Sequence, residues 1–293
     1  MNNILVVFNY NAGRKQTVKY KKIIHKFLLK NGYKYKFVSI DELAADDFTE
    51  FDTIIAAGGD GTVNKTAQIA AEKDKTLAII PSGTANLLAA KLGIPFNLKK
   101  NLKIIEKGNI KRIDVLKING RQCVLRCGFG YDADIICRTP QSLKNKFGYF
   151  AYFIAGIILA FRLSHKDYEI TSQGRTFSVK ASCIITANAG NMYKNIISLA
   201  DKSELDDGMF DVFILKTVNP IAFFYEIARN IFGIRTNNSR AQYFKTDNLS
   251  IKNNKTICHI DGEKTQFKGN IEVSITPQAV KAFSSRTYAS IRQ

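Results

Sequence analysis

The 293-residue sequence lacks the cysteine spacing of a disulfide framework or a zinc site. Its five cysteines are an odd number and contain no CxxC pair, and four of them lie in apolar stretches. Reduced, buried thiols and a reducing cytoplasm are therefore expected. The first residues, MNNILVVFNYNAG, also lack the basic start and long apolar core of a signal peptide.

Acidic residues are scarce relative to basic ones: 25 Asp and Glu stand against 43 Lys and Arg, a formal net charge of +18. Such a charge favours anionic partners, namely nucleic acid, nucleotides or an acidic membrane surface. The alternative is a lysine-rich composition that serves only solubility. No helix-turn-helix, zinc-finger or single-strand-binding signature is present, so we expect no nucleic-acid partner.

Long hydrophobic runs are few. Residues 147–163, FGYFAYFIAGIILAFRL, contain Arg162 as their single charge. The run is slightly short for a membrane span of ~20 residues and has aromatic residues in its middle. We therefore expect a buried or interfacial helix here in preference to a span.

The first part of the chain alternates apolar strands with helices. Strands are expected at 4–8, 35–40, 52–57 and 77–80, and helices around 23–28, 41–51, 63–72 and 86–92. This alternation predicts a parallel sheet with helices on both faces, as in a Rossmann-like nucleotide-binding domain.

The rest of the chain has short strands separated by polar turns. They are expected at 112–125 (with an Asn119-Gly120 hairpin), 168–171, 176–187, 209–215, 248–252, 257–260 and 271–275, with a helix at 221–234. This pattern predicts an antiparallel β-sandwich. We expect a nucleotide-binding domain at 1–118 and an acceptor-binding sandwich at 119–275. Residues 276–293 are expected to pack back on the first domain, and the active site to lie in the cleft between domains.

Glycine-containing turns follow three of the first-domain strands, at Asn9–Gly13, Gly58–Thr62 and 81–84. Such turns meet at the carboxyl edge of a parallel sheet, where backbone N–H groups bind phosphate. Asp60, between glycines, can hold a metal through water, accept a hydroxyl proton, or cap the following helix. Neither a Walker A motif nor a GxGxxG motif is present, which disfavours P-loop and nicotinamide sites.

The motifs GGDGTVN and PSGTANLLA resemble the paired signature of the diacylglycerol kinase catalytic domain. Asn9–Gly13 resembles that family's first nucleotide-binding turn, and Asp206–Gly208 and Asp261–Glu263 follow in the expected order. The resemblance covers nearly the whole chain and is closest to the bacterial soluble lipid kinases, relatives of sphingosine and ceramide kinases. It implies ATP- and Mg²⁺-dependent phosphorylation of a hydroxyl on a diacylglycerol-like or long-chain-base-like lipid. A cytoplasmic enzyme at the inner face of an anionic membrane is then expected.

The resemblance also implies roles for individual residues. Asp60 would lie near the γ-phosphate, where it steers Mg²⁺ or engages the acceptor hydroxyl. The proton acceptor would be Glu263, or Asp261 beside it. An ordinary Asp-Gly hairpin is the alternative for this pair. The residues expected to surround ATP are Asn9, Tyr10, Asn11, Ala12, Gly13, Gly59, Asp60, Gly61, Thr62, Val63, Asn64, Lys65 and Thr84.

A second, structural Mg²⁺ is implied at Asp207, through its side chain and the carbonyls of Glu204 and Met209. The alternative is an acidic surface turn. His259 lies two residues before Asp261 on the same strand face. Packing is its expected role, and support of the catalytic residues is the alternative.

Three positions depart from the family pattern: Tyr10 replaces Pro, Lys65 replaces Glu, and Leu87 follows Asn86 where diacylglycerol kinases have Asp. The last change weakens the case for diacylglycerol itself as the acceptor. A kinase of a soluble hydroxyl compound, as in NAD kinases, is one alternative function. A non-catalytic nucleotide or lipid sensor is another, although it has no need of an acceptor base. A homodimer is left open.

Overall fold

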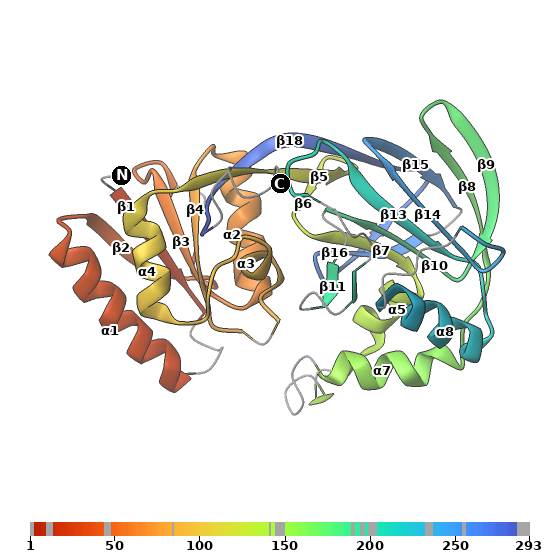
Figure 1. Cartoon of the computed structure of the whole chain (residues 1–293), viewed down its shortest axis with the longest axis horizontal. Coiled ribbons are helices and arrows are strands. Elements are labelled where there is room, and N and C mark those ends of the chain that lie inside the picture. The colour runs from red at the N-terminus through yellow and green to blue at the C-terminus, as the bar shows by residue number, and fades with distance from the viewer. Residues whose placement is uncertain are drawn as a thin grey trace. The chain divides into compact units, whose positions relative to one another are not determined.

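The structure is a computed structural model that describes residues 3–9, 14–43, 48–83, 85–140, 142–143, 150–188, 191–193, 197–198, 204–231, 237–253 and 256–285. The chain divides into two compact units, one of Met1–Ile113 with Gln278–Gln293 and the other of Asp114–Pro277. The strands β5 (Ile110–Ile118) and β18 (Ile271–Phe283) each have residues in both units (Figure 1). The boundaries expected from the sequence, at 118 and 275, stay predictions.

The first unit is built on a parallel sheet in the order β2-β1-β3-β4. The central strands are buried on both faces, because their apolar runs are covered by helices on each side. The last part of β18 joins β4 in parallel. The predicted α/β architecture is confirmed. The strands are β1 (Asn3–Phe8), β2 (Lys34–Ser39), β3 (Thr53–Gly58) and β4 (Thr76–Pro81).

Two helices, α1 (Arg14–Lys30) and α4 (Leu98–Lys107), contribute to one apolar core with the sheet. α2 (Asp60–Glu72) and α3 (Leu87–Lys91) begin just after β3 and β4. The sequence did not predict α4, whose start is capped by the Asn97 side chain. The helix expected at 41–51 is wrong for its described part: 41–43 and 48–51 are turns, bends and a short 3₁₀ segment.

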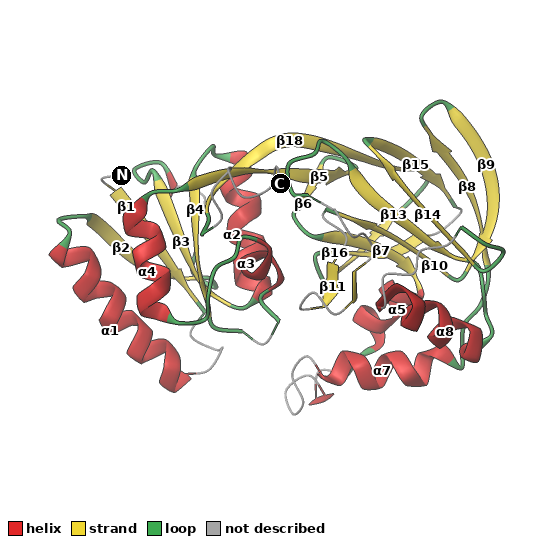
Figure 2. Cartoon of the chain, viewed as in Figure 1, coloured by secondary structure: helices red, strands yellow, loops and turns green. Residues whose placement is uncertain are grey.

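The second unit contains two antiparallel sheets with a shared apolar core, which confirms the predicted sandwich (Figure 2). One sheet has the order β14-β13-β10-β7-β16-β17. Its strands are β7 (Arg126–Gly130), β10 (Cys183–Ala187), β13 (Phe210–Leu215), β14 (Ala241–Thr246), β16 (Thr256–Ile260) and β17 (Glu263–Phe267). The other contains β6 (Arg121–Cys123), β8 (Lys166–Ser172), β9 (Arg175–Ala181), β15 (Asn248–Lys252) and parts of β5 and β18. A short pair joins β11 (Asn191–Tyr193) to β12 (Ile197–Ser198).

The single strand expected at 176–187 is wrong. β9 ends at Ala181 in one sheet, and β10 begins at Cys183 in the other. Ser182 marks the change, and its buried hydroxyl donates to the carbonyls of Leu215 and Thr217. Residues 176–187 therefore turn a corner between two sheets within one uninterrupted run of strand-forming residues.

Three helices cover the outer face of the six-stranded sheet: α5 (Tyr131–Arg138), α7 (Phe150–Ala160) and α8 (Pro220–Ile231) (Figure 1). α7 lies within the apolar run noted in the sequence, of which residues 147–149 fall outside the described part. No helix in the described part of the chain is long and apolar enough to cross a membrane. The expected free thiols are confirmed, and four of the five are buried.

Candidate functional site

The glycine turns after β3 and β4 are in direct contact. A Cβ atom on Gly83 would lie 2.5 Å from the Cα atom of Gly59, and a Cβ atom on Gly58 would lie 2.5 Å from the Thr62 side chain. Real Cβ atoms do not approach other atoms so closely, so both backbones require glycine here. The two motifs thus form one junction at the carboxyl edge of the parallel sheet.

The Asp60 carboxylate holds this junction together. Its Oδ2 atom accepts the Asn86 N–H at 2.8 Å, and its Oδ1 atom accepts the Leu87 N–H at 2.6 Å. Asn86, in the left-handed region at φ 49°, in turn accepts the Gly83 N–H through its own side chain at 3.1 Å. Asp60 therefore caps α3, whereas the sequence-based alternative was a cap on its own helix, where Gly59 is the N-cap.

Two buried side-chain oxygen atoms of the same motif have no partner in the described part of the chain. Thr62 and Asn64 are buried on α2, and the Thr62 hydroxyl and the Asn64 carbonyl oxygen have no hydrogen-bond partner among the described residues. Buried polar atoms without partners are costly, so such atoms indicate a missing polar ligand or water. Lys65, on the same helix, is exposed.

The other expected nucleotide contacts are less fully described. Asn9 follows β1, and its N–H donates to the Ala57 carbonyl at 3.4 Å. Gly61 and Val63 lie in the first turn of α2. Tyr10, Asn11, Ala12, Gly13 and Thr84 lie outside the described residues.

In the second unit, Asp261 anchors a hairpin. Asp261 and Gly262, at φ 50° and 90°, form the two-residue turn between β16 and β17. The Asp261 carboxylate accepts three backbone N–H groups, from Val124 at 2.7 Å, Leu125 at 2.8 Å and Arg126 at 3.1 Å. Its position ties the turn to the segment that joins β6 to β7.

Glu263 is placed differently. It is the first residue of β17, pairs with Ile260 across the turn, and is exposed. No hydrogen bond or ion pair engages its side chain within the described part of the chain. Of the two carboxylates in this turn, Asp261 is committed to the backbone and Glu263 is available for chemistry.

A buried ionic chain lies directly behind the turn. The Arg126 guanidinium donates to Asp132 Oδ1 at 3.1 Å, and the His259 Nε2 atom is 2.6 Å from Asp132 Oδ2. The His259 Nδ1 atom accepts the Gly262 N–H at 3.2 Å. Burial alone would raise the pKa of the Asp132 carboxyl, but Arg126 and His259 outweigh it and hold this pKa at about 2.

Little in the sequence indicated that Arg126, Asp132 and His259 form this ionic network. Packing was the expected role of His259, which is indeed fully buried, but its ring is also hydrogen-bonded at both nitrogens. Gly128 makes room for it, since a Cβ atom there would overlap the Asp132 carboxylate and lie 2.6 Å from His259 Nε2. The sequence signal that could have indicated this network was Gly128, a glycine within an apolar strand.

The expected second Mg²⁺ site has a competing cation. Asp207 Oδ2 is 2.5 Å from the Lys245 ammonium, and Asp207 Oδ1 accepts the Met209 N–H at 3.1 Å. Glu204 is exposed nearby in sequence. Because the Lys245 ammonium already pairs with the Asp207 carboxylate, this arrangement does not fit a divalent ion. The described residues also contain no cluster of three or more His, Cys, Asp or Glu that could hold a metal.

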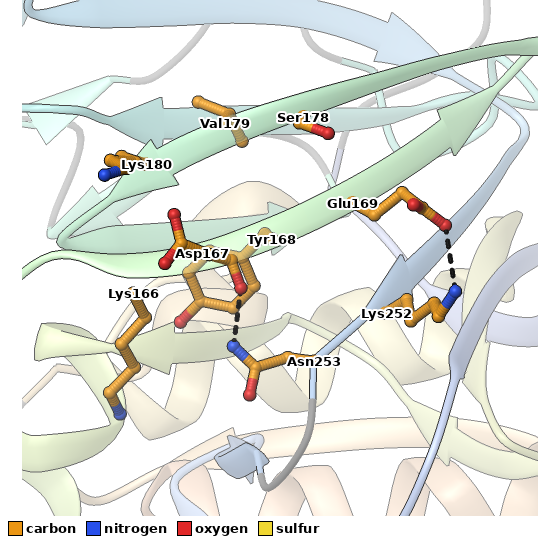
Figure 3. Close-up of a pocket in the computed structure, with 9 residues that line it drawn as sticks. All are labelled: Lys166, Asp167, Tyr168, Glu169, Ser178, Val179, Lys180, Lys252 and Asn253. Atoms are coloured by element: carbon orange, nitrogen blue, oxygen red, sulfur yellow. Dashed lines mark hydrogen bonds and ion pairs between the residues drawn. The ribbon is translucent and has the colours of Figure 1, made fainter.

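An open pocket of about 760 Å³ lies elsewhere, over β8, β9 and β15 (Figure 3). Its walls carry a Glu169–Lys252 ion pair at 3.3 Å, and the Asn253 amide donates to the Asp167 carbonyl at 2.9 Å. It contains none of the residues singled out from the sequence. Its charged, exposed lining does not suit a lipid chain.

Comparison with protein families gives two matches that together span most of the chain. Residues 3–118 match the model of the diacylglycerol kinase catalytic domain. Residues 126–284 match the model of the YegS C-terminal NAD kinase beta sandwich-like domain.

Individual relatives agree with the family matches. The chain is 33% identical over 221 residues to a diacylglycerol kinase of Bacillus subtilis, covering 73% of this chain and 72% of the relative. It is 28% identical over 242 residues to a diacylglycerol kinase of Staphylococcus saprophyticus, covering 79% of each. A solved structure of a diacylglycerol kinase from Bacillus anthracis superposes with a TM-score of 0.73 at 22% identity, over 97% of each chain. This last likeness concerns the fold.

Proposed function

The chain belongs to the diacylglycerol kinase family and is a lipid kinase, and on this premise we propose that it transfers the γ-phosphate of ATP to a hydroxyl of a membrane lipid. The junction of Gly59 with Gly83, fixed by Asp60, is the observation that carries the proposal. It brings two glycine turns and a helix start to one sheet edge, the arrangement that binds phosphate groups.

The nucleotide half of the reaction is assigned to the first unit. The N-terminus of α2 offers backbone N–H groups and the positive end of the helix dipole to the phosphates. The unpartnered Thr62 hydroxyl and Asn64 carbonyl oxygen fit a polar ligand at the same turn. Asn9 to Gly13, Lys65 and Thr84 complete the proposed contacts.

Gly83→Ala tests this assignment. The new Cβ would collide with Gly59, so we expect weaker binding of a non-hydrolysable ATP analogue by calorimetry. The melting curve of Gly83→Ala, compared with that of the wild type, serves as the control for folding. Wild-type affinity in Gly83→Ala would contradict the nucleotide site.

Glu263 is the proposed proton acceptor. As the acceptor oxygen bonds to the γ-phosphorus, its proton passes to the Glu263 carboxylate, and the bond between phosphorus and the ADP oxygen breaks. Asp261 is less suited, because three backbone N–H groups already engage its carboxylate. Positioning and charge neutralisation supply most of the remaining catalysis in phosphoryl transfer.

Mg²⁺, when bound with the nucleotide, supplies positive charge to the phosphate oxygens. Asp60 is the residue that would hold it, through water, because its carboxylate is fixed at the phosphate turn. We expect chelation of Mg²⁺ to abolish turnover. The separate site at Glu204, Asp207 and Met209 stays a prediction, and Lys245 counts against it.

The acceptor is a diacylglycerol-like or long-chain-base-like lipid. Two of the similar proteins are named diacylglycerol kinases, whereas Leu87 departs from the family pattern. Incubation with γ-labelled ATP, Mg²⁺ and a total lipid extract, followed by identification of the labelled lipid, separates these acceptors. The absence of any labelled lipid, with label in a soluble product, would contradict a lipid kinase acting on these acceptors.

The outer helices of the second unit are the proposed membrane contact. α7 buries small residues, Ala151, Ala155, Gly156 and Ala160, and exposes large ones. Phe153 is 59% exposed on α7, and Ile221 is 82% exposed on α8. A helix with its large apolar side chains outward is unusual in water and typical of an interaction surface. The formal charge of +18 adds attraction to anionic lipid.

A further inference from the structure

The buried chain behind the catalytic turn has a definite direction of hydrogen bonding. The Gly262 N–H is a donor, so the His259 Nδ1 atom that receives it carries no proton. The proton of the neutral ring is then on Nε2, where it donates to Asp132 Oδ2 at 2.6 Å. The hydrogen-bond network thus assigns the tautomer of His259.

The second acceptor oxygen of Asp132 fixes this arrangement. Arg126 donates to Asp132 Oδ1, so the carboxylate is held as an acceptor toward both neighbours. Asp132 therefore requires a donor from His259 Nε2, and the Gly262 N–H requires that Nδ1 carry no proton. Arg126 also exchanges backbone hydrogen bonds with Asp261, accepting its N–H at 2.9 Å and donating to its carboxylate.

The turn is therefore held from two sides. Asp261 is bound by the backbone of the β6–β7 connection, and the Gly262 peptide N–H is bound by His259. Gly262 has a φ of 90°, a conformation that a substituted residue rarely adopts. Glu263 follows these anchors directly in the chain, so both of them fix the Asp261–Gly262 peptide from which the Glu263 backbone leaves the turn.

We propose that His259 is a positioning residue for the phosphoryl transfer, with Asp132 and Arg126 selecting its tautomer so that it fixes the Asp261–Gly262 peptide, one residue before Glu263. This proposal rests on the proposed role of Glu263 as proton acceptor. The side chain of the base is exposed, so rigid support of its peptide is what the fold can supply. His259 acts through Glu263 and does not touch the substrate.

Direct observation of the tautomer is the first test. The chain contains three histidines, so the ¹⁵N imidazole spectrum of the intact protein is simple, and His25→Gln and His165→Gln assign it. We expect a proton on Nε2 of His259 and none on Nδ1. A proton on Nδ1 would overturn the proposal. This measurement needs no activity.

Asp132→Asn should change the tautomer while leaving the shape of the side chain intact. The oxygen of the substituted amide pairs best with Arg126, so the amide NH₂ group faces His259 Nε2 and requires an acceptor there. The ring proton then moves to Nδ1 and opposes the Gly262 N–H. We expect this shift in the ¹⁵N spectrum together with a loss of kcat of about 10- to 100-fold and little change in KM for ATP. A tautomer shift with wild-type kcat would overturn the proposal.

Two substitutions of His259 separate hydrogen bonding from packing. His259→Phe fills the space but accepts nothing, and should lower kcat by about 10- to 100-fold. His259→Asn places an oxygen near the position of Nδ1, and should recover most of this loss. Phe129→Leu, in the same sandwich core, is the packing control, since it should lower the melting temperature and leave kcat unchanged.

The double variant His259→Phe with Glu263→Gln distinguishes the proposal from the function on which it rests. If His259 acts through Glu263, the double variant is no slower than Glu263→Gln alone. Independent, multiplicative losses would overturn the positioning role. A wild-type rate for Glu263→Gln would instead overturn the base assignment and the positioning role with it. A severe Glu263→Gln loss beside a wild-type rate for His259→Phe would overturn the positioning role alone.

Discussion

Asp60 in the first unit and Asp261 in the second occupy similar positions. Each carboxylate lies beside glycine in a turn, and each accepts backbone N–H groups from a segment remote in sequence. Around Asp60, the neighbouring Thr62 and Asn64 each have a buried oxygen atom with no partner among the residues that the structure describes. Around Asp261, three backbone N–H groups donate to the carboxylate, and the exposed side chain is Glu263.

The two units differ in whether the structural role and the chemical role belong to one acidic residue or to two. In the first unit one carboxylate serves both, because Asp60 holds the junction at the place where the phosphates are proposed to bind. In the second unit the two roles are separated by two residues: Asp261 anchors the turn and Glu263 is left for proton transfer. Substitution of an anchor should cost stability, and substitution of a chemical group should cost rate. Substitution of Asp60 should lower both stability and rate.

Glu263→Gln should have the largest effect on rate. The amide keeps the size of the side chain but cannot accept the hydroxyl proton, so we expect kcat to fall by about 100- to 10,000-fold. The melting temperature and the affinity for ATP should stay at wild-type values, because Glu263 is exposed and lies outside the nucleotide-binding unit.

Asp261→Asn is the matched comparison. Its new NH₂ group would face the N–H donors of Val124 or of Leu125 and Arg126, and an opposed donor costs about 1–3 kcal/mol of folding stability. A smaller loss of kcat than in Glu263→Gln is expected. A severe kcat loss in Asp261→Asn with a mild one in Glu263→Gln would reverse the assignment of anchor and base.

Asp60→Asn should lower both rate and stability. The amide would oppose the N–H of either Asn86 or Leu87, which costs about 1–3 kcal/mol in the free energy of unfolding. Loss of the carboxylate that is proposed to hold Mg²⁺ at the phosphate turn should lower kcat by about 100-fold. Denaturant unfolding and steady-state kinetics measure the two effects separately. Equal activity of the variant and the wild type at saturating ATP and acceptor would end the assignment of Asp60.

The buried Asp132 predicts a pH dependence of stability in the second unit. Its pKa is lowered from 3.8 to about 2 in the folded state, so its contribution is present above pH ~4 and is lost as the pH falls through ~2. Urea unfolding between pH 5 and 2 should show this loss in the wild type, and Asp132→Asn should lack it. An identical pH dependence in both would contradict the ionised, buried Asp132.

The same contrast explains what the sequence could and could not predict. The apolar strands of the first unit and the glycine motifs are local patterns, and both were predicted. The Asp60 contact with Asn86 joins residues 26 positions apart, and the His259 contact with Asp132 joins residues 127 apart. Neither contact can be predicted from the sequence alone, because only the fold brings these residues together.

Errors in the predicted fold have similar causes. The corner at Ser182 interrupts a run of strand-forming residues without a Gly or Pro signal, so one strand was expected where there are two. Lys245, whose ammonium group pairs with Asp207, lies on the neighbouring strand β14. Cross-strand pairing of this kind depends on register, which the sequence around Asp207 does not reveal.

The smallest expected effect concerns the membrane surface. We expect the purified protein to bind vesicles that contain acidic lipid, and to leave them as salt screens the attraction. Phe153→Ser and Ile221→Ser should each weaken this binding by about tenfold, because each removes roughly 1.4 kcal/mol of apolar burial. Vesicle sedimentation at low and high salt measures the electrostatic and the apolar contributions to binding.

Leu29→Ser on α1 is the control, since Leu29 is 58% exposed but belongs to the first unit. Its vesicle binding should equal that of the wild type. If all three variants bind equally and only salt matters, the positive charge acts alone and the exposed face of α7 and α8 has another role. If binding resists salt and disappears in Phe153→Ser, apolar insertion dominates. Equal binding of the wild type to neutral and acidic vesicles would exclude the electrostatic term, because only the acidic surface attracts the basic side chains.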